Sequence, residues 1–381
     1  MQVQRIIFLY KRILSKLDSP LEKQITIIVF AKMSNGKCID KLNSLLLSKE
    51  NMSLYLIRES SLRSNLPIKE FNLSETIPKR SIFVISWKFF VGMYLALKMK
   101  PDIIISYYLI PHGIIGNIIG KIVGIPTIVS MIGSDLSYLN QRSLLKNVFI
   151  KILSMSNLVL VTGTNSKETL KNLGIKEDKI RIMANTIDVN KFSIQRNLLI
   201  KKDIDLIFVG RFLPVKRIDR ILRIMYEFQR RFGRLYSLHA YLVGDGVLKS
   251  ELMAFSQKLN LTNVDFVGYK EDIIPYMTRS KILLLTSLSE GFPATVLEAM
   301  SMGIVPVVGN VGDITDIIKD GENGFIIKEY NYEDIAELIF KLLKSPGILR
   351  EIAEKAIETS TEFSYEKGAL IWKNILYNMN L

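Results

Sequence analysis

Two charged side chains stand between a glycine and an expected helix in the second half of the chain. Arg211 and Lys216 belong to the segment GRFLPVK, which starts at Gly210 and directly follows the apolar run DLIFV. The arginine guanidinium is a planar fork of donors and the lysine is a compact charge, and both commonly hold phosphate oxygens. A helix that begins next adds positive potential at its N-terminus. The segment predicts a diphosphate site, although a solvated basic loop explains the pair equally well when it is taken alone.

A second segment, SEGFPATVLE, runs from the apolar run ILLLTS into an expected helix. Pro293 suits the first turn of a helix, and Gly291 and Phe292 offer backbone donors at its start, where an anion is favoured. Glu298 follows in the apolar helix ATVLEAM, where a carboxylate needs donors such as sugar hydroxyls. The alternative is that Glu290 and Glu298 are ordinary cap and surface groups.

A third loop, Gly244-Asp245-Gly246, follows the apolar run HAYLV. Small residues at such a place let backbone N–H groups approach a ligand. Turns after strands often contain Gly and Asp, however. By itself this loop is a weak indication of a binding site.

The order of these segments resembles one known family. The succession GRFLPVK, VGDG, VGYKEDI, SEGFPATVLEAMSMGIVPVV and GENGFII is similar to the C-terminal domain of the retaining GT-B glycosyltransferases of family 4, also called glycosyltransferase group 1. Upstream, GIPTIVSMIGSDL and IRIMANTIDVNKF resemble that family's G-x-P…H-G-x-D and P-N-G-x-D-x-x-x-F segments. The resemblance extends over roughly residues 100 to 365, and Glu290 and Glu298 have the family's E-x7-E spacing.

The resemblance implies a nucleotide-diphosphate sugar as donor substrate, with neither cofactor nor metal. Arg211 and Lys216 would neutralise the departing diphosphate, and this charge would stabilise a cation-like glycosyl transition state. Glu290 would hold hydroxyls of the transferred sugar and Glu298 the ribose, while the region of Tyr269 would lie against the base. The implied catalytic residues are Arg211, Lys216 and Glu290, and the implied donor-binding residues are Gly210, Gly244, Asp245, Gly246, Tyr269, Gly291, Phe292, Pro293 and Glu298.

The acceptor side departs from the family pattern. Ile132 stands where many relatives have the His of H-G-x-D, and Thr186 stands where they have the Gly of Asn-Gly. His112 is a candidate replacement for the missing histidine, but a histidine satisfied by backbone at a helix start is the more common situation. The D-x-D at 203–205 begins a strand rather than ending one, so we do not assign it a metal. The predicted acceptor-side residues are His112, Gly133, Asp135 and Asn185.

Apolar runs alternate with helix-length segments along the chain, as in parallel sheets covered by helices on both faces. One series starts at Ile25–Phe30 and another at Asp205–Val209. We therefore expect an α/β chain with two Rossmann-like doubly wound domains facing across a cleft, and the resemblance implies that this arrangement is the GT-B fold. The expected parts are an acceptor-side domain at 1–190 with a basic amphipathic leader at 1–24, a nucleotide-sugar domain at 191–365, and a helix at 366–381 that crosses back to the first domain.

The amino-acid composition limits the classes of protein to which this chain could belong. The 381 residues are 48% hydrophobic and 23% charged, which predicts a water-soluble globular chain of two domains. One cysteine, Cys38, excludes an internal disulfide and fits a reducing compartment. One Cys and two distant His cannot form a zinc cluster of the usual kind.

The positive charge is concentrated in the first half. Residues 1–190 carry 26 Lys and Arg against 13 Asp and Glu, so they hold +13 of the total +14. Together with apolar residues at helical spacing in the leader, this predicts attachment to an anionic membrane surface, with WKFF at 87–90 and the segment 144–152 as further contacts. The protein is then expected to lie peripherally on the cytoplasmic face of the cell membrane, with a lipid-linked or cell-surface polysaccharide acceptor. The alternatives are a merely solvated basic surface and a leader that packs on its own domain.

Other activities remain open at this level. A GT-B enzyme of different chemistry, such as a nucleotide-sugar epimerase or a phosphorylase, is the main alternative. A nucleic-acid-binding protein would fit the pI of about 9.5, but the sequence has no clustered aromatic and basic motif of that kind, so we predict no nucleic-acid partner. The uncharged stretch Ile103–Gly120 is better explained by a strand and a helix than by a membrane span.

Overall fold

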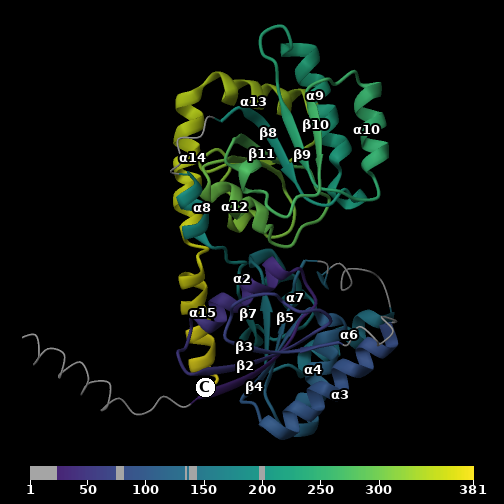
Figure 1. Ribbon diagram of the computed structural model, residues 1–381, viewed down its shortest axis with the longest axis vertical. Coiled ribbons are helices and arrows are strands. Elements are labelled where there is room, and N and C mark those ends of the chain that lie inside the picture. Colours follow the sequence, from purple (N-terminus) through teal and green to yellow (C-terminus); the bar gives the residue numbers. More distant parts are fainter. Residues whose placement is uncertain (1–23, 74–80, 134, 137–143, 197–201) are drawn as a thin grey trace, which may run out of the picture.

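The computed structural model describes residues 24–73, 81–133, 135–136, 144–196 and 202–381. The predicted leader lies outside these residues except for Gln24. Figure 1 shows two α/β domains, one built from the first half of the chain and the other from the second, joined along one side by the last helices. The prediction of a GT-B fold with two doubly wound domains is confirmed.

The N-terminal domain is built on a seven-stranded sheet within the described residues, in the order β3-β2-β1-β4-β5-β6-β7. All neighbouring strands are parallel. The chain order reverses between β1 and β4, so loops after these strands open at the topological switch point, where ligands bind in such sheets. The strands are β1 Ile25–Phe30, β2 Met52–Arg58, β3 Ile68–Asn72, β4 Ile103–Tyr107, β5 Thr127–Ser130, β6 Leu158–Val161 and β7 Ile180–Ile182.

Helices cover both faces of this sheet, because β1, β4, β5 and β6 are mainly apolar and are buried along nearly their whole length. The helices are α2 Asn35–Leu46, α3 Ser81–Met99, η1 Leu109–Gly113, α4 Ile114–Val123, α6 Leu144–Met155, α7 Thr164–Asn172 and η2 Glu177–Lys179.

The C-terminal domain repeats the plan with six parallel strands in the order β10-β9-β8-β11-β12-β13. Its switch point lies between β8 and β11, and the segments GRFLPVK and SEGFPATVLE follow these two strands. The strands are β8 Ile204–Val209, β9 Ala240–Val243, β10 Val264–Gly268, β11 Ser280–Leu285, β12 Val305–Gly309 and β13 Phe325–Ile327. The helices are α8 Val189–Arg196, η3 Pro214–Lys216, α9 Ile218–Phe232, α10 Lys249–Lys258, α11 Ile274–Met277, α12 Ala294–Ser301, η4 Ile314–Asp316, α13 Tyr332–Lys344 and α14 Pro346–Thr361.

The last helix, α15 Tyr365–Asn378, returns to the N-terminal domain and packs on α2. Its Trp372 belongs to the same buried cluster as Cys38 and Leu42. The chain passes between the two domains twice, once between β7 and α8 and once between α14 and α15. These two segments meet where the Ile187 N–H donates to the Phe363 carbonyl at 2.9 Å. The domains are therefore connected twice at one side of the molecule, next to the interdomain cavity described below.

Candidate functional site

A cavity lies between the two domains at the carboxyl ends of their strands. From the C-terminal domain it is lined by Lys216, Glu290 and the segment Gly291–Thr295. From the N-terminal domain it is lined by Gly133 and Asn185 among others. Predicted donor-side and acceptor-side residues thus come together at one place.

Lys216 and Glu290 form the main charged pair of the cavity. The Lys216 Nζ lies 2.5 Å from the Glu290 Oε1, and the Ser287 hydroxyl donates to the same oxygen at 2.6 Å. The backbones of the two loops are also joined, since the Leu288 N–H donates to the Val215 carbonyl at 2.8 Å. The switch point of the sheet therefore presents a preorganised cation and carboxylate.

The start of α12 lies beside this pair. Pro293 occupies the N-cap with φ −74° and ψ 106°, so it stands just before the helix rather than in its first turn as we expected. Residues 291–295 line the cavity with the positive end of the helix dipole. An anion placed here would meet both the helix N-terminus and Lys216.

The N-terminal domain touches the same segment. The Asn185 side-chain amide donates to the Phe292 carbonyl. Gly133, with φ +52°, packs so closely on Gly291 that a Cβ on Gly291 would lie 2.7 Å from the Gly133 Cα. The close approach of the two domains requires glycine at 291, and the positive φ favours glycine at 133. Both residue types are therefore explained without reference to a ligand.

The glycines of the VGDG loop have a packing role as well. A Cβ on Gly244 would lie 1.8 Å from the Gly210 carbonyl oxygen, and one on Gly246 would lie 2.5 Å from the Phe212 carbonyl oxygen. The Gly244 N–H donates to the Gly268 carbonyl at 2.9 Å. The loop thus holds the GRFLPVK segment in place, and its contact with a donor stays a prediction.

Three predicted donor residues are exposed and outside the cavity lining. Arg211 and Tyr269 lie in the loops after β8 and β10, and Tyr269 is among the most exposed aromatic side chains described. Asp245 pairs with Lys249 at 3.1 Å, and this hydrogen bond holds the pKa of Asp245 below its usual range. Their assigned roles stay predictions.

Glu298 lies on α12 and lines an adjoining cavity between the domains. Asp40, Lys191 and Tyr365 line the same cavity. Burial, and next the charge of Asp40, raises the pKa of Glu298 to about 7. A carboxylate in this state gains from hydroxyl donors, which favour the ionised form.

His112 is fully buried and does not line the cavity. Its Nδ1 lies 2.8 Å from the Tyr107 carbonyl oxygen and its Nε2 lies 2.9 Å from the Lys88 Nζ. Burial, and next the charge of Lys88, lowers the pKa of His112 to about 3, so the ring is neutral. Because the ammonium donates to Nε2, Nδ1 carries the proton and donates to the backbone. These contacts match the structural alternative for this histidine.

Asp135 is also buried and outside the cavity lining. Its Oδ2 accepts from the N–H groups of Leu109 and Ile132, each at 3.1 Å. Burial raises its pKa to about 6 despite these two donors. Asp135 therefore fixes the loops after β4 and β5 relative to each other, and so it positions Gly133 at the cavity.

The cavity contains two N-terminal residues that sequence reasoning missed. Lys41, on α2, is only 6% exposed, and its Nζ has no hydrogen-bond partner within the described part of the chain. Its neighbour Asp40 accepts a hydrogen bond from the Tyr365 hydroxyl at 2.5 Å. Burial lowers the pKa of Lys41 to about 8 and raises that of Asp40 to about 6. The KCIDKL pattern shows a buried helix face, but nothing in it marks a lysine that faces a cavity.

A second feature that the sequence did not reveal is a polar contact between the domains. Asp313, which is fully buried, accepts from the hydroxyls of Thr162 at 2.8 Å and Ser166 at 2.6 Å. The Thr164 N–H donates to Asp316 at 2.6 Å. This cluster holds the carboxyl edge of β6 against the loop after β12.

Comparisons with known proteins bear on this arrangement. Residues 189–360 match the model of the family described as glycosyl transferases group 1. The N-acetyl-alpha-D-glucosaminyl L-malate synthase of Bacillus anthracis is 24% identical over 295 residues, which are 74% of this chain and 76% of the relative. The UDP-Gal:alpha-D-GlcNAc-diphosphoundecaprenol alpha-1,3-galactosyltransferase of Escherichia coli is 24% identical over 263 residues, which are 63% of this chain and 66% of the relative.

A solved structure resembles the whole described architecture. The crystal structure of Anabaena HepE in complex with UDP-glucose matches this one with a TM-score of 0.74 at 17% sequence identity. The match covers 93% of this chain and 100% of the HepE chain. Its likeness establishes the two-domain fold, and the family model covers the domain that holds Lys216, Glu290 and Glu298. The chain is a GT-B-fold glycosyltransferase.

In this glycosyltransferase the family match and the paired charges occupy the same domain. The matched residues run from α8 through α14 and include both loops at the switch point between β8 and β11. Lys41, Asp135 and Gly133 lie outside them. The acceptor side must therefore be argued from this chain's own residues.

Proposed function

We propose that this glycosyltransferase moves a sugar from a nucleotide-diphosphate donor to a lipid-linked or cell-surface polysaccharide acceptor, with retention of the anomeric configuration and without a metal. The observation that carries the proposal is the Lys216–Glu290 pair at the start of α12, in the cavity between the domains. Glu290 is placed to accept from sugar hydroxyls, and Lys216 with the helix start is placed to stabilise negative charge on a departing diphosphate.

Electrostatics supports the absence of a metal requirement. When the glycosidic bond breaks, the sugar becomes cation-like and the diphosphate gains negative charge. A lysine and a helix N-terminus that are already oriented neutralise this charge without reorganisation. The exposed Arg211, in the same segment as Lys216, would add a second cation near the diphosphate.

The lipid-linked acceptor is supported by charge and by one relative. The first half of the chain carries nearly all of the net positive charge, and the Escherichia coli relative is named for transfer to a diphosphoundecaprenol-linked sugar. We place the enzyme at the cytoplasmic face of the membrane for these reasons. The Bacillus anthracis relative, named for a malate product, provides the soluble acidic acceptor against which this choice can be tested.

Donor use can be tested before the acceptor is known. Purified protein is incubated with UDP-, GDP- and ADP-sugars, and slow donor hydrolysis and protection against thermal unfolding are measured. We expect one nucleotide class to give both. Epimerisation of the donor sugar would contradict the proposal. So would thermal protection by a nucleotide sugar if no donor is hydrolysed or used for transfer.

With the donor fixed, an undecaprenyl-diphosphate-linked sugar and L-malate are compared as acceptors, and the anomeric configuration of the product is determined by NMR. We expect transfer to the lipid-linked sugar, with retention and with full rate in the presence of a chelator. Inversion, or loss of activity in chelator that a divalent ion restores, would refute the corresponding part of the mechanism.

A further inference from the structure

The outer side of the N-terminal domain is unusually apolar. On α3 the side chains of Phe90, Tyr94 and Leu97 are exposed and recur at helical spacing, and Phe90 is 68% exposed. In a surface helix this stripe is normally polar, because only the opposite stripe packs on the core. Here the core side is formed by Val84, Leu95 and Ala96, so both sides of the helix are apolar.

The two neighbouring helices continue this surface. Ile118 and Ile122 on α4 are exposed, as are Val148 and Met155 on α6. The helix α3 contacts α4, and α4 contacts α6. Figure 1 shows all three on the side of the N-terminal domain that lies away from α15. We call the exposed side of α3, α4 and α6 the apolar face.

The charges on the apolar face have one sign. Lys98, Lys121 and Lys151 are exposed, and each lies three or four residues from an exposed apolar side chain on its own helix. None of the three helices contains Asp or Glu. A surface of this composition is complementary to a layer with an apolar interior and anionic headgroups.

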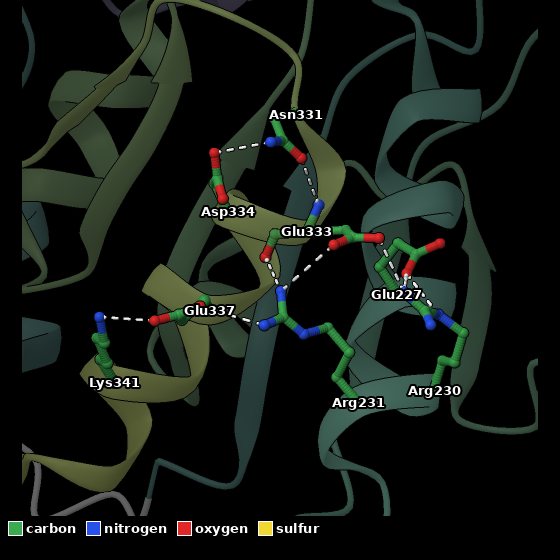
Figure 2. Close-up of polar contacts among 8 residues, drawn as sticks. All are labelled: Glu227, Arg230, Arg231, Asn331, Glu333, Asp334, Glu337 and Lys341. Carbon is green, nitrogen blue, oxygen red and sulfur yellow. Dashed lines mark hydrogen bonds and ion pairs between the residues drawn. The ribbon is translucent and has the colours of Figure 1, made fainter.

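The C-terminal domain provides the contrast. Helices α9 and α13 cover its sheet in the same way, but their exposed sides carry charges of both signs in an ion-pair network. Figure 2 shows Arg231 between Glu333 and Glu337, with Lys341 on the far side of Glu337. The apolar face is therefore not a general property of the outer helices of this chain.

The helix α3 is too firmly built into the domain to cross a membrane by itself. Its window Ile82–Met99 is long and apolar enough to span a bilayer by length and composition, and 28% of that window is buried. The fully buried Lys88 binds Glu59 and His112, both at 2.9 Å. Gly92 packs on Phe30 so closely that a Cβ would lie 2.4 Å from its ring. These contacts hold α3 along the sheet, so a bilayer would meet it from the side.

We propose that the apolar face is the surface on which this protein lies in an anionic lipid bilayer. A second copy of the chain fits less well, because two such faces would bring lysines together with no carboxylate from these helices between them. The inference rests on the proposed lipid-linked acceptor for its purpose. It assigns the membrane contact to α3, α4 and α6, in addition to the leader. The segments 87–90 and 144–152, which the sequence predicts as contacts, lie on α3 and α6, although Lys88 is buried.

The test uses the full chain and sedimentation with vesicles of phosphatidylcholine, with and without phosphatidylglycerol. The apolar variant is Phe90→Ser/Leu97→Ser/Ile122→Ser, and its control is Leu235→Ser/Tyr377→Ser, two residues that are comparably exposed elsewhere. We expect the wild type and the control to bind anionic vesicles, and the apolar variant to bind at least about tenfold more weakly.

The charge variant Lys98→Gln/Lys121→Gln/Lys151→Gln is compared with Lys328→Gln/Lys341→Gln/Lys355→Gln, which removes equal charge from the C-terminal domain. We expect the first set to weaken binding by roughly fivefold per lysine and the second set to change it little. Unchanged binding by the apolar variant would overturn the proposal. Failure of the wild type to bind anionic vesicles at low salt would also overturn it. So would sedimentation velocity that shows a dimer for the wild type and the other variants but a monomer for the apolar variant.

Donor hydrolysis in solution separates this inference from the proposed function. Hydrolysis should be equal in the wild type and all four variants, because none of the changed residues lines the cavity. Binding to vesicles without sugar transfer would support the apolar face as a membrane surface and refute the proposed glycosyltransferase activity. Sugar transfer without vesicle binding would support the activity and refute the membrane surface.

Discussion

The two halves of the cavity differ in how their charged side chains are paired. On the C-terminal side, Lys216 is paired with Glu290 at 2.5 Å, and Ser287 supports the carboxylate. On the N-terminal side, the Lys41 Nζ is buried with no hydrogen-bond partner among the described residues, and burial raises the pKa of Asp40. The C-terminal half has its charges paired before any ligand binds, whereas the N-terminal half retains a buried amine that no described residue hydrogen-bonds.

This difference indicates what each half requires from a ligand. Paired groups are already oriented, so under the proposed function the C-terminal side would stabilise a transition state without rearrangement. A buried cation without a partner lowers the stability of the fold, and such residues persist where they have a function. The three predictions below test this comparison, starting with the largest effect.

The first prediction concerns the paired half. Lys216→Ala and Glu290→Ala should each lower sugar transfer by more than ~100-fold, because each removes a preorganised charge at the reacting diphosphate or sugar. Initial rates at saturating donor measure the loss, and thermal unfolding checks that the fold is intact. Lys355→Ala, which breaks an exposed pair with Glu351 at 2.8 Å, is the control. Near-normal turnover of either cavity variant would remove the donor-site assignment.

The second prediction concerns the unpaired half. Lys41→Met keeps the length of the side chain and removes the buried amine, so it should raise the free energy of unfolding by about 1–3 kcal/mol. Urea denaturation measures this gain, and Lys37→Met on the exposed side of the same helix should give none. If Lys41 serves the acceptor, transfer falls while donor hydrolysis is kept. A destabilised Lys41→Met protein would show that the amine has a partner in solution, and the contrast between the halves would be lost.

The third prediction uses the pKa of Glu298, which burial and Asp40 raise from 4.5 to about 7. Between these values the folded state holds a proton that the unfolded state has released, so this group's contribution to stability falls as pH rises from about 4.5 to 7. Glu298→Gln should remove that part of the pH dependence, on the order of 1–3 kcal/mol between pH 5 and 8.

Denaturant unfolding at several pH values measures the effect, and Glu354→Gln is an exposed control on α14. Parallel pH profiles for the wild type and Glu298→Gln would refute the raised pKa. A nucleotide whose ribose donates to the ionised carboxylate should also release protons on binding near pH 7, which calorimetry in two buffers detects.

The sequence predicts the grouping of residues better in the C-terminal half of the cavity than in the N-terminal half, and the reason is physical. Lys216, Glu290 and the start of α12 lie in two loops that follow adjacent strands, so strand order alone brings them together. Lys41, Asp40 and Tyr365 meet only because α15 returns across 325 residues of chain to lie on α2. Contacts of that separation leave no local pattern.

Some secondary-structure elements are also absent from the sequence prediction. The strand β3 is mostly polar, with IKEFN at an edge of the sheet, so no apolar run marks it. The sequence predicts residues 144–152, which form most of α6, only as a membrane contact, and it gives no expectation for α13 and α14, although their pattern is helical. At Gly244 and Gly291 the sequence predicts ligand contacts where the structure shows close packing between loops. A sequence pattern cannot distinguish close approach to a ligand from close approach to another loop.

The return of α15 also has a consequence for synthesis of the protein. Domains usually fold as they emerge from the ribosome, the N-terminal one first. Here Trp372 fills part of the core that Cys38 and Leu42 begin, so the core of the first domain stays incomplete until the second domain has been translated. Until α15 arrives, the domain with the apolar face leaves α2 uncovered, and this interval is when the nascent chain is most exposed to aggregation.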